Sequence, residues 1–139
     1  MKSFNYFNLS VPHPEGFSDA SQVTLLGPVV KGFRTNVVIV HEAVKRGETA
    51  ETYAATRLPA IQNAVGFLKV ELQTAATFGA LLGYWREHTL SLEQRLVTQF
   101  QFYCLSKGEM YTFTFSCDPS VAKETRAMAQ AFLKGTTFR

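Results

Sequence analysis

The amino-acid sequence predicts an α+β domain in which two helices flank a twisted, mainly antiparallel sheet. Three observations lead to this prediction. Segments with strand character follow directly on one another, so neighbouring strands should form antiparallel hairpins. Helical signals occur in only two places, which leaves part of the sheet uncovered. The chain has 139 residues, close to the commonest size of one domain, and no repeat or linker divides it, so we expect a single domain over residues 1–139.

The expected strands are recognised by alternation of apolar and polar residues, or by a high content of β-branched and aromatic residues. Pro12 should stop the first strand, and Gly79 and Gly108 should each lie in the turn of a hairpin. The strands are predicted at residues 7–11, 23–25, 33–40, 67–78, 80–89, 94–105 and 110–117.

The first helix is predicted between Thr49 and Val65. Thr49 is a suitable N-cap, and Glu51 places a carboxylate in the first turn, where the helix dipole favours negative charge. Gly66 provides a natural end. Pro59 lies inside this helix, and because proline has no backbone N–H we expect a missing hydrogen bond and a bend there.

The second helix is predicted to begin at Asp118 and Pro119, an N-cap followed by proline at the first helical position. Gly135 should end it. The residues between them carry one face with helical spacing, made of Val121, Thr125, Met128 and Phe132.

The composition argues against several classes of protein. The formal net charge is only +3 and the basic residues are scattered, so we expect no nucleic-acid partner, which would need a basic patch. The N-terminal residues are interrupted by polar side chains, and no segment approaches about 20 apolar residues. We therefore expect neither an export signal nor a membrane anchor, and a cytoplasmic location.

No residue pattern for catalysis or metal binding stands out. The sequence has no glycine-rich phosphate loop and no Gly-x-Ser-x-Gly elbow, and its three histidines stand far apart. If the chain turns near Gly108, Cys104 lies near the turn and Cys117 far from it, so both should be reduced and buried. We expect a protein that is not an enzyme and that has no cofactor and no metal.

Arg57 is an anomaly in the first predicted helix. On a helical projection it falls in the middle of an apolar arc that contains Tyr53, Ala54, Leu58, Ile61 and Val65. A charge in a fully sealed arc is unfavourable. Arg57 therefore either reaches solvent or a buried carboxylate, or part of the arc lines an open surface.

The strand at residues 94–105 has an unusual second face. One face is expected to pack in the core and consists of Leu96, Thr98, Phe100, Phe102 and Cys104. The opposite face mixes apolar groups with uncharged amides and consists of Val97, Gln99, Gln101, Tyr103 and Leu105. Val38 and Val40 share a similar face of their own strand. This surface is either a second core layer under the helices or a binding surface for a mostly apolar partner.

An ordered set of short motifs resembles the DcrB-like family over nearly the whole chain. It begins with a strand that leads to proline, a Gly-aromatic pair and Asp-x-Ser, here at residues 7–12 and 16–21. It continues with the strand and turn at residues 36–40, Glu42 and Gly47, and then with Tyr53, Leu58, Gly66-Phe67, Gly79-Ala80 and Tyr84-Trp85. It ends with residues 99–103 and 111–114. The order of these motifs, rather than any one of them, carries the resemblance.

The resemblance implies the fold of PsbP and Mog-type proteins, an antiparallel sheet flanked by helices. Without an export signal, the chain resembles the cytoplasmic branch of the family, the Eag-type chaperones of type VI secretion effectors. The resemblance then implies a homodimer whose concave apolar face holds and shields N-terminal transmembrane helices of an effector protein, and which assists its loading onto the secretion spike. The alternative is a PsbP/Mog-like adaptor that binds a folded protein partner.

The effector-binding groove implied by the resemblance falls on Val23, Leu25, Val38, Arg57, Ile61, Val65, Val97 and Gln101. Gln99 lies on the same amide-bearing face as Gln101 and joins this set. Arg57 departs from the family pattern, in which an amide is expected. Either the hydrogen-bonding role of the family is not kept at this position, or the client has a nearby hydrogen-bond acceptor.

Overall fold

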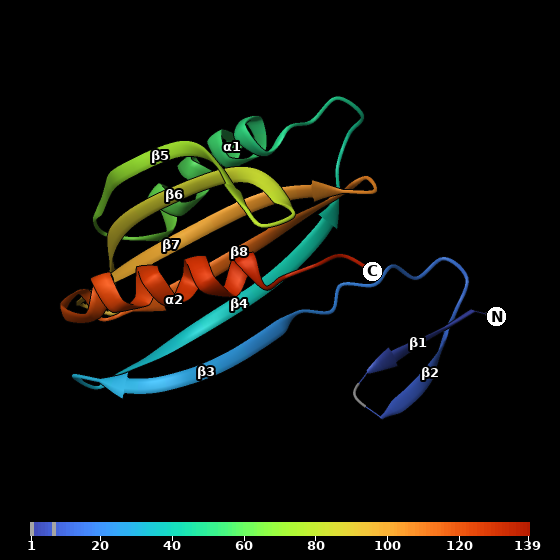
Figure 1. The fold of residues 1–139 in the computed structure, drawn as a ribbon, viewed down its shortest axis with the longest axis horizontal. Coiled ribbons are helices and arrows are strands. Elements are labelled where there is room, and N and C mark those ends of the chain that lie inside the picture. The colour runs from blue at the N-terminus through green and yellow to red at the C-terminus, as the bar shows by residue number, and fades with distance from the viewer. Residues whose placement is uncertain (1, 7) are drawn as a thin grey trace.

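A six-stranded sheet forms the centre of the computed structural model, which describes residues 2–6 and 8–139 (Figure 1). All neighbouring strands are antiparallel, in the order β3-β4-β8-β7-β6-β5. The strands are β3 (Val23–Val30), β4 (Phe33–Ala43), β5 (Leu68–Phe78), β6 (Leu81–Leu92), β7 (Arg95–Ser106) and β8 (Glu109–Cys117). Together with helices α1 (Ala50–Ala64) and α2 (Ala122–Lys134), this confirms the predicted α+β fold class.

The N-terminal residues form a separate two-stranded sheet, which Figure 1 shows away from the main one. It pairs β1 (Lys2–Tyr6) with β2 (Leu9–His13). The sequence predicted only one strand here, and Phe7, its first residue, lies outside the described residues. The predicted stop at Pro12 is wrong, because β2 continues through Pro12 opposite Ser3. Both strands of such a ribbon are edge strands, where a missing N–H is tolerated.

Strand β3 is longer than predicted. It was expected at residues 23–25 but reaches Val30, and its register against β4 shifts between Leu26 and Val29. Gly27 and Pro28 lie at this irregularity, on an edge strand where such breaks in the ladder are common. The two later hairpins formed as expected, with β5 paired to β6 and β7 paired to β8.

The helix ends follow the predicted capping residues closely. The Thr49 hydroxyl accepts a hydrogen bond from the backbone N–H of Thr52, and α1 ends one residue before Val65, whose backbone is extended. Asp118 caps a short 3-10 turn, η1 (Pro119–Val121), rather than α2 itself, which begins at Ala122. Gly135 ends α2 as predicted.

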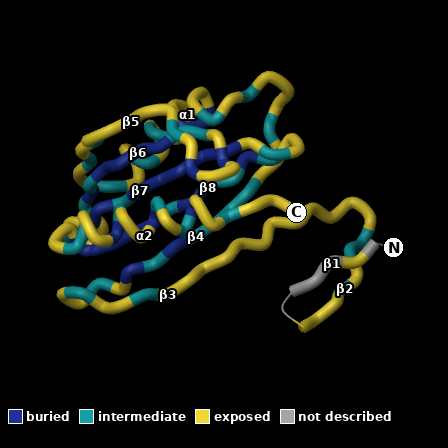
Figure 2. The backbone as a smooth tube through the Cα atoms, in the orientation of Figure 1, coloured by how far each residue is buried: buried dark blue, intermediate teal, exposed yellow. Residues whose placement is uncertain are grey.

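The two helices cover opposite faces of the sheet. Under α2 lies the larger core, in which Phe100, Phe102 and Phe115 pack with Ala129 and Leu133 of the helix. Under α1 lies a smaller core made of Tyr53, Ala54, Tyr103 and Met110. Burial is concentrated in the central strands, whereas β3 and the segment before it are largely exposed (Figure 2). The α1 face of the sheet is thus only partly covered.

Candidate functional site: a hollow beside helix α1

A hollow of about 440 Å³ lies between the second half of α1 and the sheet. We call it the α1 hollow. Helix α1 supplies one wall and strands β4, β6, β7 and β8 supply the floor and the other walls. Its lining consists of Val40, Arg57, Ala60, Ile61, Ala64, Val65, Leu90, Leu92, Gln99, Gln101, Tyr103, Thr112 and Thr114.

The hollow exists because only the first half of α1 docks on the sheet. Tyr53 and Ala54 are the buried residues of this helix, and a guanidinium N–H of Arg86 donates to the Ala54 carbonyl at 2.8 Å. After Pro59 the helix has no buried residue: Ala60 and Ala64 are exposed, and Ile61 is only half-buried. The second half of the helix therefore presents small and apolar side chains to the hollow.

Hydrogen-bonded amides form the polar part of the floor. Gln101 is 8% exposed, and its side-chain carbonyl accepts hydrogen bonds from Arg86 at 2.9 Å and from the Tyr103 hydroxyl at 2.7 Å. Its amide N–H donates to the Thr114 hydroxyl at 3.2 Å. These three hydrogen bonds fix the orientation of the Gln101 side chain. The hydroxyl groups of Thr112 and Thr114 lie beside it in the lining of the hollow.

A second, parallel set of hydrogen bonds supports Gln99. The fully buried His88 donates from Nε2 to the Gln99 side-chain carbonyl at 2.8 Å, and the Gln99 amide donates to the Ser116 hydroxyl at 3.0 Å. Nδ1 of His88 is buried and has no hydrogen-bond partner among the residues that the structure describes. Burial lowers the pKa of His88, the Gln99 hydrogen bond opposes this effect, and the Arg86 charge adds to it. His88 is therefore held in its neutral form near neutral pH.

The lowered pKa of His88 predicts that stability falls in mild acid. In the unfolded chain the imidazole returns to its ordinary pKa of about 6.5, so below that pH the unfolded state binds more protons than the folded state. We expect the free energy of unfolding, measured with urea, to be unaffected by this group above pH about 6.5. Below it, the loss should approach at most about 1.4 kcal/mol per pH unit. His88→Gln should show a shallower slope, and equal slopes for the two proteins would contradict the prediction.

Arg57 lies at the rim of the α1 hollow and not inside the core. Its guanidinium lies 5.5 Å from the centre of the Tyr53 ring and 3.9 Å from a carboxylate oxygen of Glu42. The Arg57 and Glu42 side chains are 53% and 52% exposed, so this ion pair is strongly screened by water. The hydroxyl of Tyr53 also donates to Glu42, and burial followed by this hydrogen bond raises the pKa of Tyr53 to about 12. The apolar face of α1 that contains Arg57 is therefore open to solvent at the rim of the α1 hollow.

The structure brings most of the predicted binding residues together. Five of them line the α1 hollow: Arg57, Ile61, Val65, Gln99 and Gln101. Val38 lies next to them, because it pairs with Thr114, which in turn pairs with Gln101, and cross-strand partners point to the same face. Val97 lies on that face too but has 0% exposure, so it supports the wall without being accessible.

The expectation that Val23 and Leu25 share this surface is wrong. Val23 pairs with Ile39 and Leu25 pairs with Val37, and Val37 belongs to the core under α2. Both residues therefore point to the opposite face of the sheet from Val38. A shift of one residue in register exchanges the two faces of a strand, and local sequence does not fix the register of an edge strand.

The two faces of β7 also differ in part from expectation. Phe100, Phe102 and Cys104 are buried as predicted, but Leu96 is 51% exposed because it lies near the hairpin end of the strand. The second face is divided between both alternatives. Val97 is fully buried, whereas Gln99, Gln101 and Tyr103 line the hollow.

Sequence reasoning missed two buried side chains of β6 that support the floor of the α1 hollow, the arginine Arg86 and the neutral histidine His88. Both occur in the middle of a predicted strand, on the same face as Tyr84, and they alternate with Trp85 and Glu87. The sequence did contain a signal for them. Residues two positions apart on a strand share a face, so Arg86 and His88 were bound to lie together on one face of β6. Glu87, on the other face, is paired with Arg126 of α2 at 2.8 Å.

Other kinds of site find little support among the described residues. They contain no group of three or more His, Cys, Asp or Glu side chains placed to hold a metal ion. They also contain no helix long and apolar enough to span a membrane. Cys104 and Cys117 are free and buried, as predicted, and burial raises the pKa of the Cys104 thiol to about 11. Cys104 pairs with Tyr111 in the sheet and Cys117 with Thr98, so the two are well separated.

Two solved structures have the same arrangement of sheet and helices. The crystal structure of PA94 from Pseudomonas aeruginosa, a protein of unknown function, matches 100% of this chain and 97% of its own, with a TM-score of 0.80 and 15% identity. The solution structure of the cyanobacterial PsbP protein CyanoP from Synechocystis matches 88% of this chain and 94% of its own, with a TM-score of 0.56 and 10% identity. The chain has a PsbP-like fold. At these identities the likeness extends to the fold alone.

The PsbP-like fold agrees with the fold that the sequence motifs implied. No family model matches the sequence, and no curated protein sequence matches it either. The narrower resemblance to Eag-type chaperones therefore rests on the ordered sequence motifs.

Proposed function

We propose that this protein is a cytoplasmic chaperone that binds and shields N-terminal transmembrane helices of a type VI secretion effector and assists its loading onto the spike protein. The observation that carries the proposal is the α1 hollow, an open surface that combines apolar walls with a floor of fixed amides and hydroxyls. This function requires binding, and it requires no catalytic group, cofactor or metal.

The chemistry of the hollow suits an apolar helix. A membrane span of about 20 apolar residues aggregates in water unless its surface is covered. Ile61, Val65 and Leu90 offer apolar contacts, and the small side chains of Ala60 and Ala64 allow a second helix to approach α1 closely. Helices from membranes also carry small polar groups at their interfaces, and the hydroxyls beside Gln101 can pair with them. The hollow would take part of one helix face, as in other helix-in-groove complexes.

We also propose that two copies associate, and edge strand β3 is the surface best suited to it. The segment Val23–Val30 contains no charged residue, and Val23, Leu25, Leu26 and Val29 are exposed on it. Natural edge strands usually carry charges that prevent pairing with another chain, so an uncharged edge favours pairing. Pairing of two β3 strands around a two-fold axis normal to the sheet would place both α1 hollows on one side.

The same β3 surface favours the second candidate function, a PsbP/Mog-like adaptor for a folded protein. A flat apolar strip on a sheet edge fits a folded surface better than it fits one helix. The two candidates differ in which surface binds the partner: the α1 hollow for the chaperone, and the β3 strip for the adaptor.

A charge placed in the α1 hollow should abolish binding of a transmembrane client. The protein would be co-expressed with an effector N-terminus that carries a span of about 20 apolar residues, and the soluble complex recovered by affinity capture. We expect Ile61→Asp to reduce the recovered complex at least about tenfold, because a carboxylate would lose hydration against the apolar helix. Val38→Asp should act in the same direction.

Gln62→Asp is the matched control for this experiment. Gln62 is the next residue on α1, is exposed, and does not line the hollow. It should bind as the unmodified protein does, and thermal unfolding would verify that all variants fold. Equal capture by Ile61→Asp and Gln62→Asp would refute the chaperone proposal. Loss of binding to a folded partner only on Leu26→Asp would favour the adaptor.

A further inference from the structure

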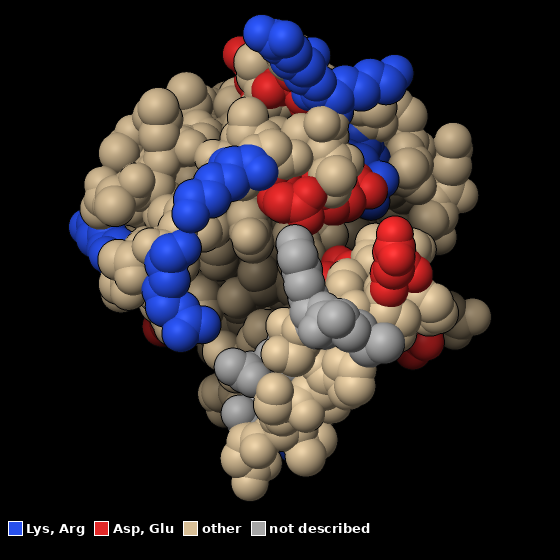
Figure 3. Space-filling view, turned by 90° about the vertical axis from the view of Figure 1, so that its right-hand side faces the viewer, with Lys and Arg blue, Asp and Glu red and all other residues tan. Residues whose placement is uncertain are grey.

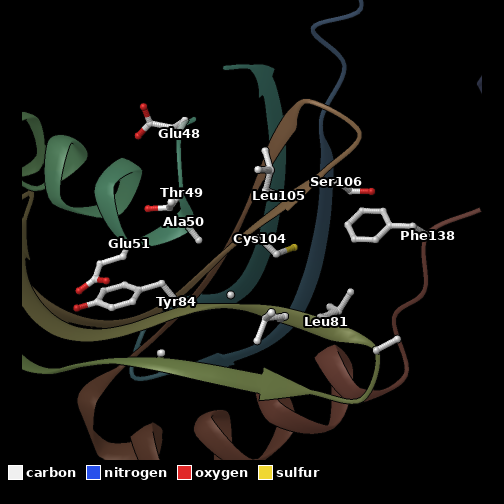
Figure 4. Close-up of a pocket in the computed structure, with 14 residues that line it drawn as sticks. Glu48, Thr49, Ala50, Glu51, Leu81, Tyr84, Cys104, Leu105, Ser106 and Phe138 are labelled. Carbon is white, nitrogen blue, oxygen red and sulfur yellow. The ribbon is translucent and has the colours of Figure 1, made fainter. Parts of the chain in front are cut away.

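A second hollow of about 660 Å³ lies at the N-terminal end of α1 (Figure 4). We call it the acid-rimmed hollow. It is bounded by the first turn of α1, the start of β6, the end of β7 and the C-terminal segment. Its lining consists of Glu48, Thr49, Ala50, Glu51, Ala75, Ala80, Leu81, Leu82, Gly83, Tyr84, Cys104, Leu105, Ser106 and Phe138.

Large apolar side chains on this surface are exposed to water. Leu82 is 75% exposed, the highest value among the exposed large hydrophobic residues of the described chain, and Leu105 and Phe138 are exposed as well. Figure 4 shows Leu105 and Phe138 on the side of the hollow away from Glu51 and Tyr84. Exposed apolar groups gathered in one hollow mark an interaction surface more often than scattered ones do.

The charge of this hollow is the opposite of that of the whole chain. Among the described residues, Glu48 and Glu51 are the only charged ones that line it, although the protein has a formal net charge of +3. Glu48 accepts a hydrogen bond from the Thr52 hydroxyl at 2.8 Å, and Glu51 makes no hydrogen bond or ion pair within the described structure. Figure 3 looks onto this end of the molecule, where acidic side chains lie on one side of a recessed part of the surface and basic side chains lie along its other side.

The two hollows meet on the α1 side of the sheet, although Leu81, Cys104 and Phe138 line the acid-rimmed hollow from the side of the α2 core. Tyr84 lines the acid-rimmed hollow, Tyr103 lines the α1 hollow, and the two tyrosines are cross-strand partners. Leu82 has the same parity on β6 as Tyr84, so it also points to the α1 face. A ligand in one hollow is therefore close to the other.

We infer that the acid-rimmed hollow binds a lysine- or arginine-bearing segment of the client, adjacent to its transmembrane span. Long basic side chains match this surface in both of their parts. Their methylene stems can cover Leu82 and Leu105, while their charged heads reach Glu48 and Glu51. Lys and Arg are enriched in the loops that flank membrane spans. The inference rests on the proposed chaperone function for the identity of the partner, but its charge complementarity is a property of the hollow itself.

A short water-soluble peptide tests the inference without a membrane span. A peptide of alternating Lys and Leu, and its counterpart with Gln in place of Lys, would be titrated into the full-length protein and followed by backbone NMR. We expect the Lys peptide to shift signals around Leu82, Leu105 and Glu51. It should bind about three- to tenfold more tightly than the Gln peptide at low salt, and this advantage should shrink at high salt.

Neutralising the two carboxylates should remove that preference. In the double variant Glu48→Gln/Glu51→Gln, both peptides should bind with equal affinity, whereas Glu93→Gln/Glu124→Gln, which removes two exposed carboxylates elsewhere, should keep the preference. Equal binding of both peptides to the unmodified protein, or shifts that map to another surface, would overturn the inference. Shifts at this hollow that depend on protein concentration alone would also overturn it, because a second copy would then be the occupant.

The peptide titration is independent of the α1 hollow. Ile61→Asp should bind the Lys peptide normally even where it fails to capture a transmembrane client. Failure of the chaperone function and failure of this inference therefore give different results.

Discussion

Arg86→Ala is expected to destabilise the folded protein by at least about 3 kcal/mol. The Arg86 guanidinium is fully buried, and among the described residues no carboxylate forms an ion pair with it. It donates instead to the carbonyl of Ala54, the side-chain carbonyl of Gln101 and the hydroxyl of Tyr103. Removal leaves these acceptors without the donor and opens a cavity beneath α1. Urea unfolding with global fitting would measure the change.

Arg86→Met separates the charge from the packing. Methionine keeps much of the side-chain volume and removes a buried charge, whose burial lowers the Arg86 pKa because the cation loses hydration. We expect Arg86→Met to be less destabilising than Arg86→Ala, since replacement of buried charge by apolar volume is often tolerated. Arg34→Ala, at an exposed arginine, should change stability by less than about 1 kcal/mol. A similar small effect for Arg86→Ala would contradict the proposed role.

Loss of Arg86 should also loosen α1 selectively. The Arg86 bond to Ala54 joins the helix to β6 at the point where the docked half ends. Amide hydrogen exchange should therefore become faster in α1 than in α2, which packs on the other face. Uniform acceleration in both helices would show that the arginine supports the fold only globally.

Gly83→Ala is expected to destabilise the protein more than alanine at any other glycine of the described strands. A Cβ at Gly83 would overlap the backbone oxygen of Tyr103 and lie 2.7 Å from the ring of Phe102. These contacts involve backbone and a buried core ring, so neither neighbour can rotate away. Strands β6 and β7 would have to separate locally, and we expect a loss of about 3 kcal/mol or more, or failure to fold.

Gly66→Ala is the matched control for Gly83→Ala. No heavy atom lies within 4 Å of a Cβ at Gly66, so the added methyl group meets open space. Alanine also restricts the unfolded chain more than glycine does, so we expect no loss of stability and up to about 1 kcal/mol of gain. Urea midpoints for both variants would be compared with the unmodified protein. A change of similar size in both would contradict the steric explanation for Gly83.

Much of the secondary structure followed from local signals. Thr49 begins α1 because its hydroxyl can pair with a free backbone N–H of the first turn, and Gly135 ends α2. The hairpin between β7 and β8 turns at Lys107 and Gly108, both with positive φ. Each of these signals depends on residues a few positions apart, and such interactions form in nearly the same way whatever the rest of the chain does.

The candidate site was predictable only where one element determined it. Ile61 and Val65 are four positions apart on one helix, and Gln99 and Gln101 are two positions apart on one strand. Each pair therefore shares a face, and periodicity alone predicts this. Val23 and Leu25 were misplaced because their face depends on how β3 pairs with β4, and an edge strand has only one neighbour to fix its register.

The sequence alone determined that this chain forms an antiparallel α+β domain, and which residues share a face within each helix or strand. Tertiary structure alone decided that α1 docks by its first half, that Arg86 is buried beneath it, and that an open hollow remains beside its second half. The physical reason is the range of the interactions. Caps, turns and periodicity act between near neighbours, whereas a hollow depends on the distance between a helix and a sheet, which packing of remote residues sets.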